Sequence, residues 1–96
     1  MNLGDIQQVV RAERSRLNEL GVESLHVFGS VARGEASEHS DVDLVVRFDR
    51  PATFDRFMTL KLLLEDGLGR PVDLVTERAL RPELRHRILA EATRVA

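Results

Sequence analysis

Two aspartates, Asp41 and Asp43, are separated by a single residue at the start of a largely apolar run. Side chains alternate between the faces of a β-strand, so both carboxylates are expected on one face, ~6.5 Å apart along the backbone, with Val42 and Leu44 facing the opposite layer. Carboxylates this close repel each other unless a cation lies between them, and magnesium prefers oxygen ligands and keeps positions open for phosphate. The spacing predicts a magnesium site on a strand that the core holds rigid.

A third aspartate, Asp73, stands in the middle of the apolar run Pro71–Val75. An unpaired charge buried in such a run would be costly. If this run is a strand beside the one that carries Asp41 and Asp43, Asp73 becomes a third metal ligand, and it could also accept a proton from an attacking hydroxyl. The three carboxylates would then form one catalytic site.

A glycine and a serine, Gly29 and Ser30, directly follow a β-rich run that ends at Phe28. A residue without a Cβ lets phosphate oxygens approach the backbone, and a short helix that starts there can present its N–H groups and a hydroxyl. Arg33 could pair with phosphate or with an acidic side chain of its own domain. We expect an anion-binding turn at Gly29 and Ser30, and both roles of Arg33 stay open.

This turn is different from a Walker P-loop. Gly29 and Gly34 have the separation of the two glycines in that motif. However, Glu35 and Ala36 stand where the motif requires Lys-Ser or Lys-Thr. The P-loop class of nucleotide-binding proteins is therefore excluded.

The elements that must position these residues follow from the spacing of apolar side chains and from turn residues. Three short strands are expected, at Ser24–Phe28, Val42–Phe48 and Pro71–Val75. Helices are expected from Leu3 to Leu20 with Gly21 as the stop, from Phe54 to Leu64 with an end near Gly67 and Gly69, and from Pro82 to Val95. Helices packed on a small sheet predict an α/β (α+β) fold.

Composition is typical of one compact domain over residues 1–96, with 43% hydrophobic and 31% charged residues. The chain has no cysteine and no apolar run long enough to span a bilayer, so we expect a cytoplasmic protein without membrane contact. The formal net charge of -2 and the 4% aromatic content disfavour strong nucleic-acid binding by this chain alone.

Taken together and in this order, the motifs resemble those of the DNA polymerase beta-like nucleotidyltransferase superfamily. Gly-Ser-x-Ala-Arg-Gly followed by Ser-Asp-x-Asp-Leu, with no appended domain, looks most like its minimal nucleotidyltransferase (MNT) group. The resemblance covers nearly the whole chain. It implies a mixed sheet flanked by helices, two magnesium ions and ATP as an NTP donor. It also implies Gly29 and Ser30 at the triphosphate, Asp41 and Asp43 as metal ligands, and Asp73 as third ligand and candidate base.

Members of this group are commonly antitoxins encoded with a HEPN-domain ribonuclease toxin, and some transfer AMP onto a tyrosine of that toxin. The resemblance therefore implies a HEPN toxin as partner and a hetero-oligomer. Because this chain contains no tyrosine, a tyrosyl acceptor must lie on another polypeptide. Two alternatives stay open: a catalytically silent antitoxin that acts by binding, and a transferase for a small-molecule hydroxyl.

The other polar residues have simpler interpretations. The three histidines, His26, His39 and His86, lack the spacing of metal ligands, and we expect them to be packed or solvated. The charged residues of the last helix are most simply its solvated face, which a partner could still use; they are Glu83, Arg85, Arg87, Glu91 and Arg94.

Overall fold

The computed structural model describes residues 1–37 and 39–96. In chain order, its elements are α1 (Leu3–Ala12), α2 (Arg14–Glu19), β1 (Val22–Phe28), α3 (Gly29–Ala32), β2 (Val42–Phe48), α4 (Phe54–Leu68), β3 (Val72–Thr76), the 3-10 helix η1 (Glu77–Ala79), α5 (Pro82–Glu91) and β4 (Thr93–Arg94). The strands form one sheet in the order β3-β2-β1-β4. β1 is antiparallel to β2 and β4, whereas β2 and β3 are parallel, so the predicted mixed sheet flanked by helices is confirmed.

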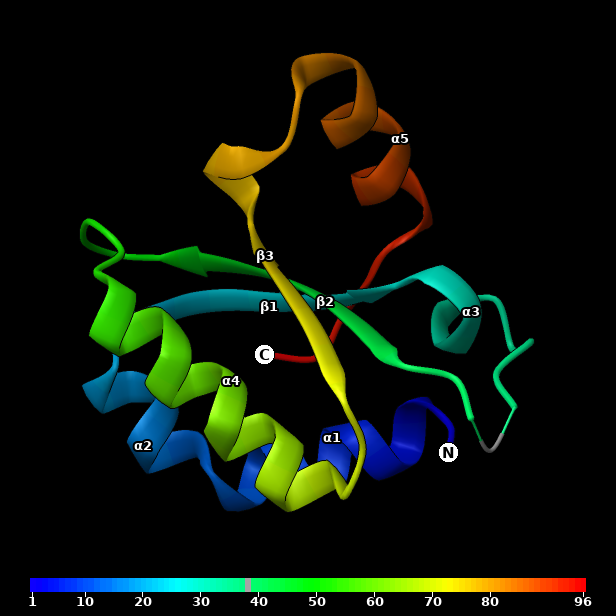
Figure 1. The fold of residues 1–96 in the computed structure, drawn as a ribbon, viewed down its shortest axis with the longest axis horizontal. Helices are drawn as coiled ribbons and strands as arrows, with labels where there is room; N and C mark the ends of the chain where they lie inside the picture. The colour runs from blue at the N-terminus through cyan, green and yellow to red at the C-terminus, as the bar shows by residue number, and fades with distance from the viewer. Residues whose placement is uncertain (38) are drawn as a thin grey trace.

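The hydrophobic core lies between the sheet and the helices α1, α2 and α4, which cover the same side of the sheet (Figure 1). Because apolar residues recur at helical spacing in these three segments, each helix presents one apolar stripe to the sheet. The buried residues that meet in this core include Ile6, Val10, Leu17, Leu25, Val27, Leu44, Val46, Leu60 and Leu64. This packing holds β1 and β2 as rigid central strands.

The central strand β2 begins and ends where its apolar run predicts, at Val42 and Phe48. Val42 and Leu44 are fully buried in the helix-side core. Strand alternation places Asp43, which is half-buried, on the opposite face. The predicted separation of carboxylate and core residues on this strand is therefore confirmed.

Two glycines end helices as the sequence predicts. Gly69 caps α4 in the left-handed conformation with φ 66°, and its N–H donates to the Glu65 carbonyl. Gly21, with φ 79°, follows α2 and leads into β1. A residue without a Cβ adopts this conformation without steric cost, so both helices can stop abruptly before a strand.

Three features differ from the prediction. The expected helix from Leu3 to Leu20 is broken at Glu13 into α1 and α2. The last helix ends at Glu91, well before Val95. The segment after it forms β4, which pairs with β1 and whose neighbour Val95 donates its N–H to the Leu25 carbonyl at 2.8 Å. Apolar spacing continues unchanged through both places, so it reveals neither the break nor the fourth strand.

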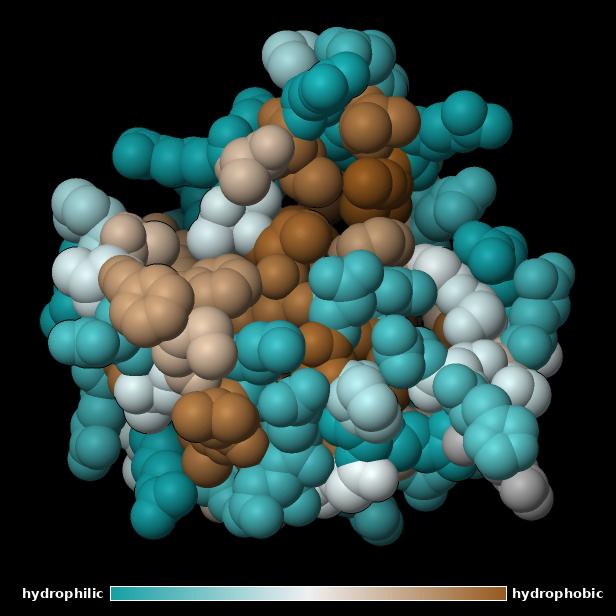
Figure 2. Space-filling model, viewed as in Figure 1, coloured by the Kyte–Doolittle hydropathy of each residue, from teal (hydrophilic) through white to brown (hydrophobic). Residues whose placement is uncertain are grey.

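The helix α5 lies on the other side of the sheet from the core helices (Figure 1). None of its residues is buried, and Leu84 is 45% exposed. Figure 2 shows apolar side chains gathered on this lobe and below it, over β3. Among residues 1–37 and 39–96, no helix combines the length and apolar character needed to cross a bilayer.

Candidate active site

The predicted catalytic aspartates come from the adjacent ends of β2 and β3. The parallel pairing of these strands sets Asp43 opposite Asp73. The Val42 N–H donates to the Pro71 carbonyl at 3.0 Å and so fixes this register at the start of both strands. The structure thus confirms that the strand of Asp73 lies beside the strand of Asp43.

The remaining aspartate, Asp41, directly precedes β2. Both Asp41 and Asp73 are exposed. Asp43 is half-buried between them. Burial raises the pKa of the Asp43 carboxyl above its ordinary value of 3.8, and the charges of Asp73 and Asp41 raise it further, while Arg33 acts in the opposite direction. The charges of Asp41 and Asp73 therefore reach the carboxyl group of Asp43.

Gly29 lies against the carboxylate of Asp43. It follows Phe28, which pairs with Asp43 across the antiparallel β1 and β2, and its φ of 72° is left-handed. A Cβ at this position would overlap the Oδ2 atom of Asp43. Sequence analysis assigned the missing side chain to the approach of phosphate, but the structure shows that the Asp43 carboxylate itself occupies that space.

The short helix α3 starts at Gly29, as the sequence predicts, and contains Ser30 in its first turn. No side chain among the described residues caps that turn. The first N–H groups of a helix have no partner inside the helix, so they can bind an oxygen from outside. The Ser30 carbonyl accepts the Glu35 N–H at 2.8 Å, which ties the end of the turn to its start.

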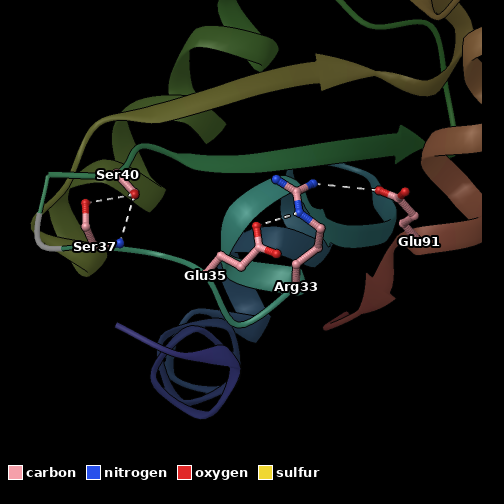
Figure 3. Close-up of polar contacts among 5 residues, drawn as sticks. All are labelled: Arg33, Glu35, Ser37, Ser40 and Glu91. Atoms are coloured by element: carbon pink, nitrogen blue, oxygen red, sulfur yellow. Dashed lines mark hydrogen bonds and ion pairs between the residues drawn. The ribbon is translucent and has the colours of Figure 1, made fainter.

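Arg33 pairs with two acids of its own domain, which is one of the two roles that the sequence leaves open. Its Nε donates to Glu35 at 3.1 Å, and its Nη1 lies 3.8 Å from a carboxylate oxygen of Glu91 in α5 (Figure 3). Arg33 also lowers the pKa of Asp43. The arginine thus stands between α3, α5 and the aspartates, and nothing in the local sequence signals its pairing with Glu91.

The loop before Asp41 is held by polar contacts. The Ser37 N–H donates to the Ser40 hydroxyl at 2.9 Å, and the two hydroxyls lie 3.2 Å apart (Figure 3). Arg70 adds a contact from the start of β3, since its Nη1 donates to the Ser37 carbonyl at 2.9 Å. Sequence analysis missed this role of Arg70, because it depends on the pairing of β2 with β3.

The donor chemistry of the aspartates fits magnesium. Among residues 1–37 and 39–96, no three His, Cys, Asp or Glu side chains are already gathered at metal-binding separation. The aspartates nevertheless offer hard oxygen donors; burial, and after it the charges of Asp73 and Asp41, raise the pKa of Asp43, and a divalent cation would offset the repulsion between them. Asp41, Asp43 and Asp73 could hold such an ion together with oxygens of a bound phosphate.

The comparisons with known proteins agree on one protein family. The nucleotidyltransferase domain family matches residues 8–95 of this chain. A protein adenylyltransferase, MntA, from Thermococcus cleftensis is 38% identical over 96 residues, which cover 99% of this chain and 97% of the relative. A solved structure of a candidate minimal nucleotidyltransferase is 45% identical, has a TM-score of 0.84 and is matched over 97% of this chain and 95% of its own.

More distant structures share the fold. A toxin–antitoxin complex with AMP-PNP contains a chain that is 22% identical with a TM-score of 0.74, and the match covers 100% of this chain and 73% of that one. A complex of a tri-AMPylated HEPN toxin of Shewanella oneidensis with its MNT antitoxin gives 19% identity and a TM-score of 0.65, over 94% and 71% of the two chains. At these identities, the likeness shows the nucleotidyltransferase fold alone.

Proposed function

The chain belongs to the nucleotidyltransferase domain family, and from that premise we propose that it transfers AMP from ATP to a hydroxyl group of a partner protein. The observation that carries this proposal is the pairing of Asp43 with Asp73 beside the turn at Gly29. This arrangement brings oxygen ligands for a metal next to backbone N–H groups that can receive phosphate.

In the proposed reaction, the acceptor hydroxyl oxygen attacks the α-phosphorus of ATP in line with the departing pyrophosphate. The bond between the α-phosphorus and the bridging oxygen breaks, and Asp73 accepts the hydroxyl proton. Asp41 and Asp43 hold magnesium, which when bound supplies positive charge that offsets the charge of the triphosphate. Gly29 and Ser30 bind the triphosphate at the first turn of α3, and Arg33 exchanges its carboxylate partners for a phosphate oxygen.

The acceptor is proposed to be a tyrosine on another polypeptide. This chain contains no tyrosine, and MntA of Thermococcus cleftensis is described as a protein adenylyltransferase. The Shewanella complex joins an MNT antitoxin with an AMPylated HEPN toxin. These relatives support a HEPN toxin as the partner, with this chain as its antitoxin in a hetero-oligomer.

The test is to incubate the chain with magnesium, one of the four NTPs and the protein encoded beside it, and to measure the intact mass of both proteins. We expect ATP to add AMP to the neighbouring protein, and peptide mapping to locate it on a tyrosine. No added mass with any nucleotide, while the toxin is still neutralised, would instead support an antitoxin that acts only by binding. Labelling of a small-molecule hydroxyl in place of the protein would support the third alternative.

A further inference from the structure

A basic cleft lies at the end of the sheet remote from the aspartates. It has a volume of about 730 Å³ and is formed where the loop after β2, the turn η1 and the side of α5 come together. Figure 1 shows the loop after β2 and η1 toward the opposite end of β2 from α3, whereas α5 lies above the sheet and nearer to α3. Phe48 in the cleft wall stands five positions after Asp43 on β2, roughly 16 Å along an extended strand. The cleft is thus separate from the site described above.

Four arginines and three carboxylates line this cleft, and one of the carboxylates, Glu77, has no ion-pair partner among the described residues. Arg47 pairs with Glu23 at 3.4 Å, and Arg50 pairs with Asp49. By contrast, within the described part of the chain no carboxylate lies within ion-pair distance of Arg78 or Arg85, which also line the cleft. Two guanidinium groups are therefore available to bind an anion.

Arg85 gives an independent sign that a ligand is missing. Its Nε is shielded from solvent and has no hydrogen-bond acceptor among the described residues. A buried donor without an acceptor is costly, and guanidinium groups bind carboxylates through two parallel hydrogen bonds. A carboxylate entering the cleft would offer Arg85 the acceptor that the chain itself does not provide.

The remaining wall of the cleft is partly apolar and also contains Thr76 and Glu77. Phe48, Pro51 and Ala52 line it, and Phe54, 77% exposed, begins α4 just beyond the loop. The volume is within the range of roughly 300–1,000 Å³ that is typical of ligand sites. Arginine and aromatic side chains are both enriched at the centre of protein interfaces.

We propose that this cleft docks an acidic segment of the acceptor protein, with Arg78 and Arg85 binding its carboxylates and Phe48 packing against its apolar side chains. Charge supports a protein partner of this kind only through Arg78 and Arg85, because η1, α5 and the turn between them hold four arginines but also Glu77, Glu83 and Glu91. The inference rests on the proposed protein acceptor and identifies where that acceptor binds. Its acidic segment would bind about 16 Å along β2 from Asp43.

The test is a binding measurement without ATP or magnesium, so it does not depend on catalysis. A fluorescein-labelled random copolymer of glutamate and tyrosine is titrated with the protein, and its fluorescence anisotropy is followed. Arg78→Ala combined with Arg85→Ala should weaken binding at least about tenfold. The control, Arg81→Ala combined with Arg87→Ala, removes the same charge from exposed positions outside the cleft and should change binding less than about twofold.

Two outcomes would overturn the proposal: equal weakening by the two double variants, or full binding by the Arg78/Arg85 variant. Arg78 is exposed, so Arg78→Glu provides the same test if the Arg85 variant does not fold. A single-stranded RNA 20-mer that displaces the copolymer more strongly than unlabelled polyglutamate would assign the cleft to nucleic acid and also overturn it. Failure of AMP transfer with intact copolymer binding would count against the proposed function alone.

Discussion

The carboxylate of Asp43 occupies the space that a side chain on residue 29 would need, so Gly29 and Asp43 are packed as a unit. The register of β1 and β2 creates this contact by pairing Phe28 with Asp43. The glycine that opens the turn proposed to bind nucleotide and the aspartate proposed to hold the metal are thereby coupled. A change at one of them is expected to displace the other.

Gly29→Ala should destabilise the protein by more than the cost of its backbone conformation alone. Gly34 provides a matched control, because its φ of 73° is nearly the same as the 72° of Gly29, whereas a Cβ at Gly34 would have nothing within 4 Å. Gly34→Ala should cost about 1–2 kcal/mol of unfolding free energy from strain. Gly29→Ala should cost clearly more in urea denaturation and should also abolish nucleotide transfer. Equal losses in the two variants would contradict the coupling of Gly29 with Asp43.

Asp43→Asn should stabilise the metal-free protein at neutral pH. Burial and the neighbouring carboxylates raise the pKa of Asp43 in the folded chain, so its protonated form favours folding. This contribution is complete below the ordinary pKa of 3.8 and is lost as pH rises through the higher folded pKa. With EDTA at pH 7, the variant should therefore have the higher Tm, and the difference should disappear as pH falls below about 4.

Thermal melts from pH 3 to 8 measure this effect. Asp66→Asn, at an exposed position on α4, serves as the control and should show no such pH-dependent gain. A Tm for Asp43→Asn at or below that of the unaltered protein at pH 7 in EDTA would contradict the electrostatic account of the site.

Arg33→Gln should raise the KM for ATP at least about tenfold, because a charge-assisted contact to phosphate is lost. Glu91→Gln, which removes one of the two carboxylate partners of Arg33, should leave that KM unchanged or lower. Since both partners are about half exposed, Glu91→Gln should cost less than about 1 kcal/mol of stability. If Arg33→Gln lowers Tm without changing KM, the arginine is only a tether between α3 and α5.

Magnesium alone should raise the Tm only slightly, whereas magnesium with a non-hydrolysable ATP analogue should raise it strongly. The reason is that no closed metal group exists among the described side chains, so phosphate oxygens must complete the coordination. Differential scanning fluorimetry at fixed magnesium and increasing analogue measures this dependence. A saturating shift with magnesium alone would contradict it.

Sequence predicts those parts of the fold that depend on local pattern. The bounds of β2 follow from its apolar run, and the stops at Gly21 and Gly69 follow from the conformational freedom of glycine. The break at Glu13 could not be predicted, because no proline or glycine marks it. The two residues of β4 are too short for a recognisable pattern and become a strand only by pairing with β1.

The candidate site also has features that the local sequence predicts and features that it does not. Strand alternation places Asp43 and Asp73 on the same face once their strands are neighbours, and that pairing, which the residues leave as a condition, is shown by the structure. The contact of Gly29 with Asp43 and the ion pair of Arg33 with Glu91 depend on how distant segments pack. Such long-range contacts leave no signal in the spacing of nearby residues.

The measurement that tests the central claim most directly is the rate of AMP incorporation from labelled ATP into the protein encoded beside this chain. The unaltered protein is compared with Asp41→Asn combined with Asp43→Asn, each with magnesium and with EDTA, after circular dichroism confirms that the variant is folded. Labelling is expected to depend on magnesium and to fall at least about a hundredfold in the double variant. Labelling by the double variant at the unaltered rate would contradict the assignment of these aspartates to catalysis.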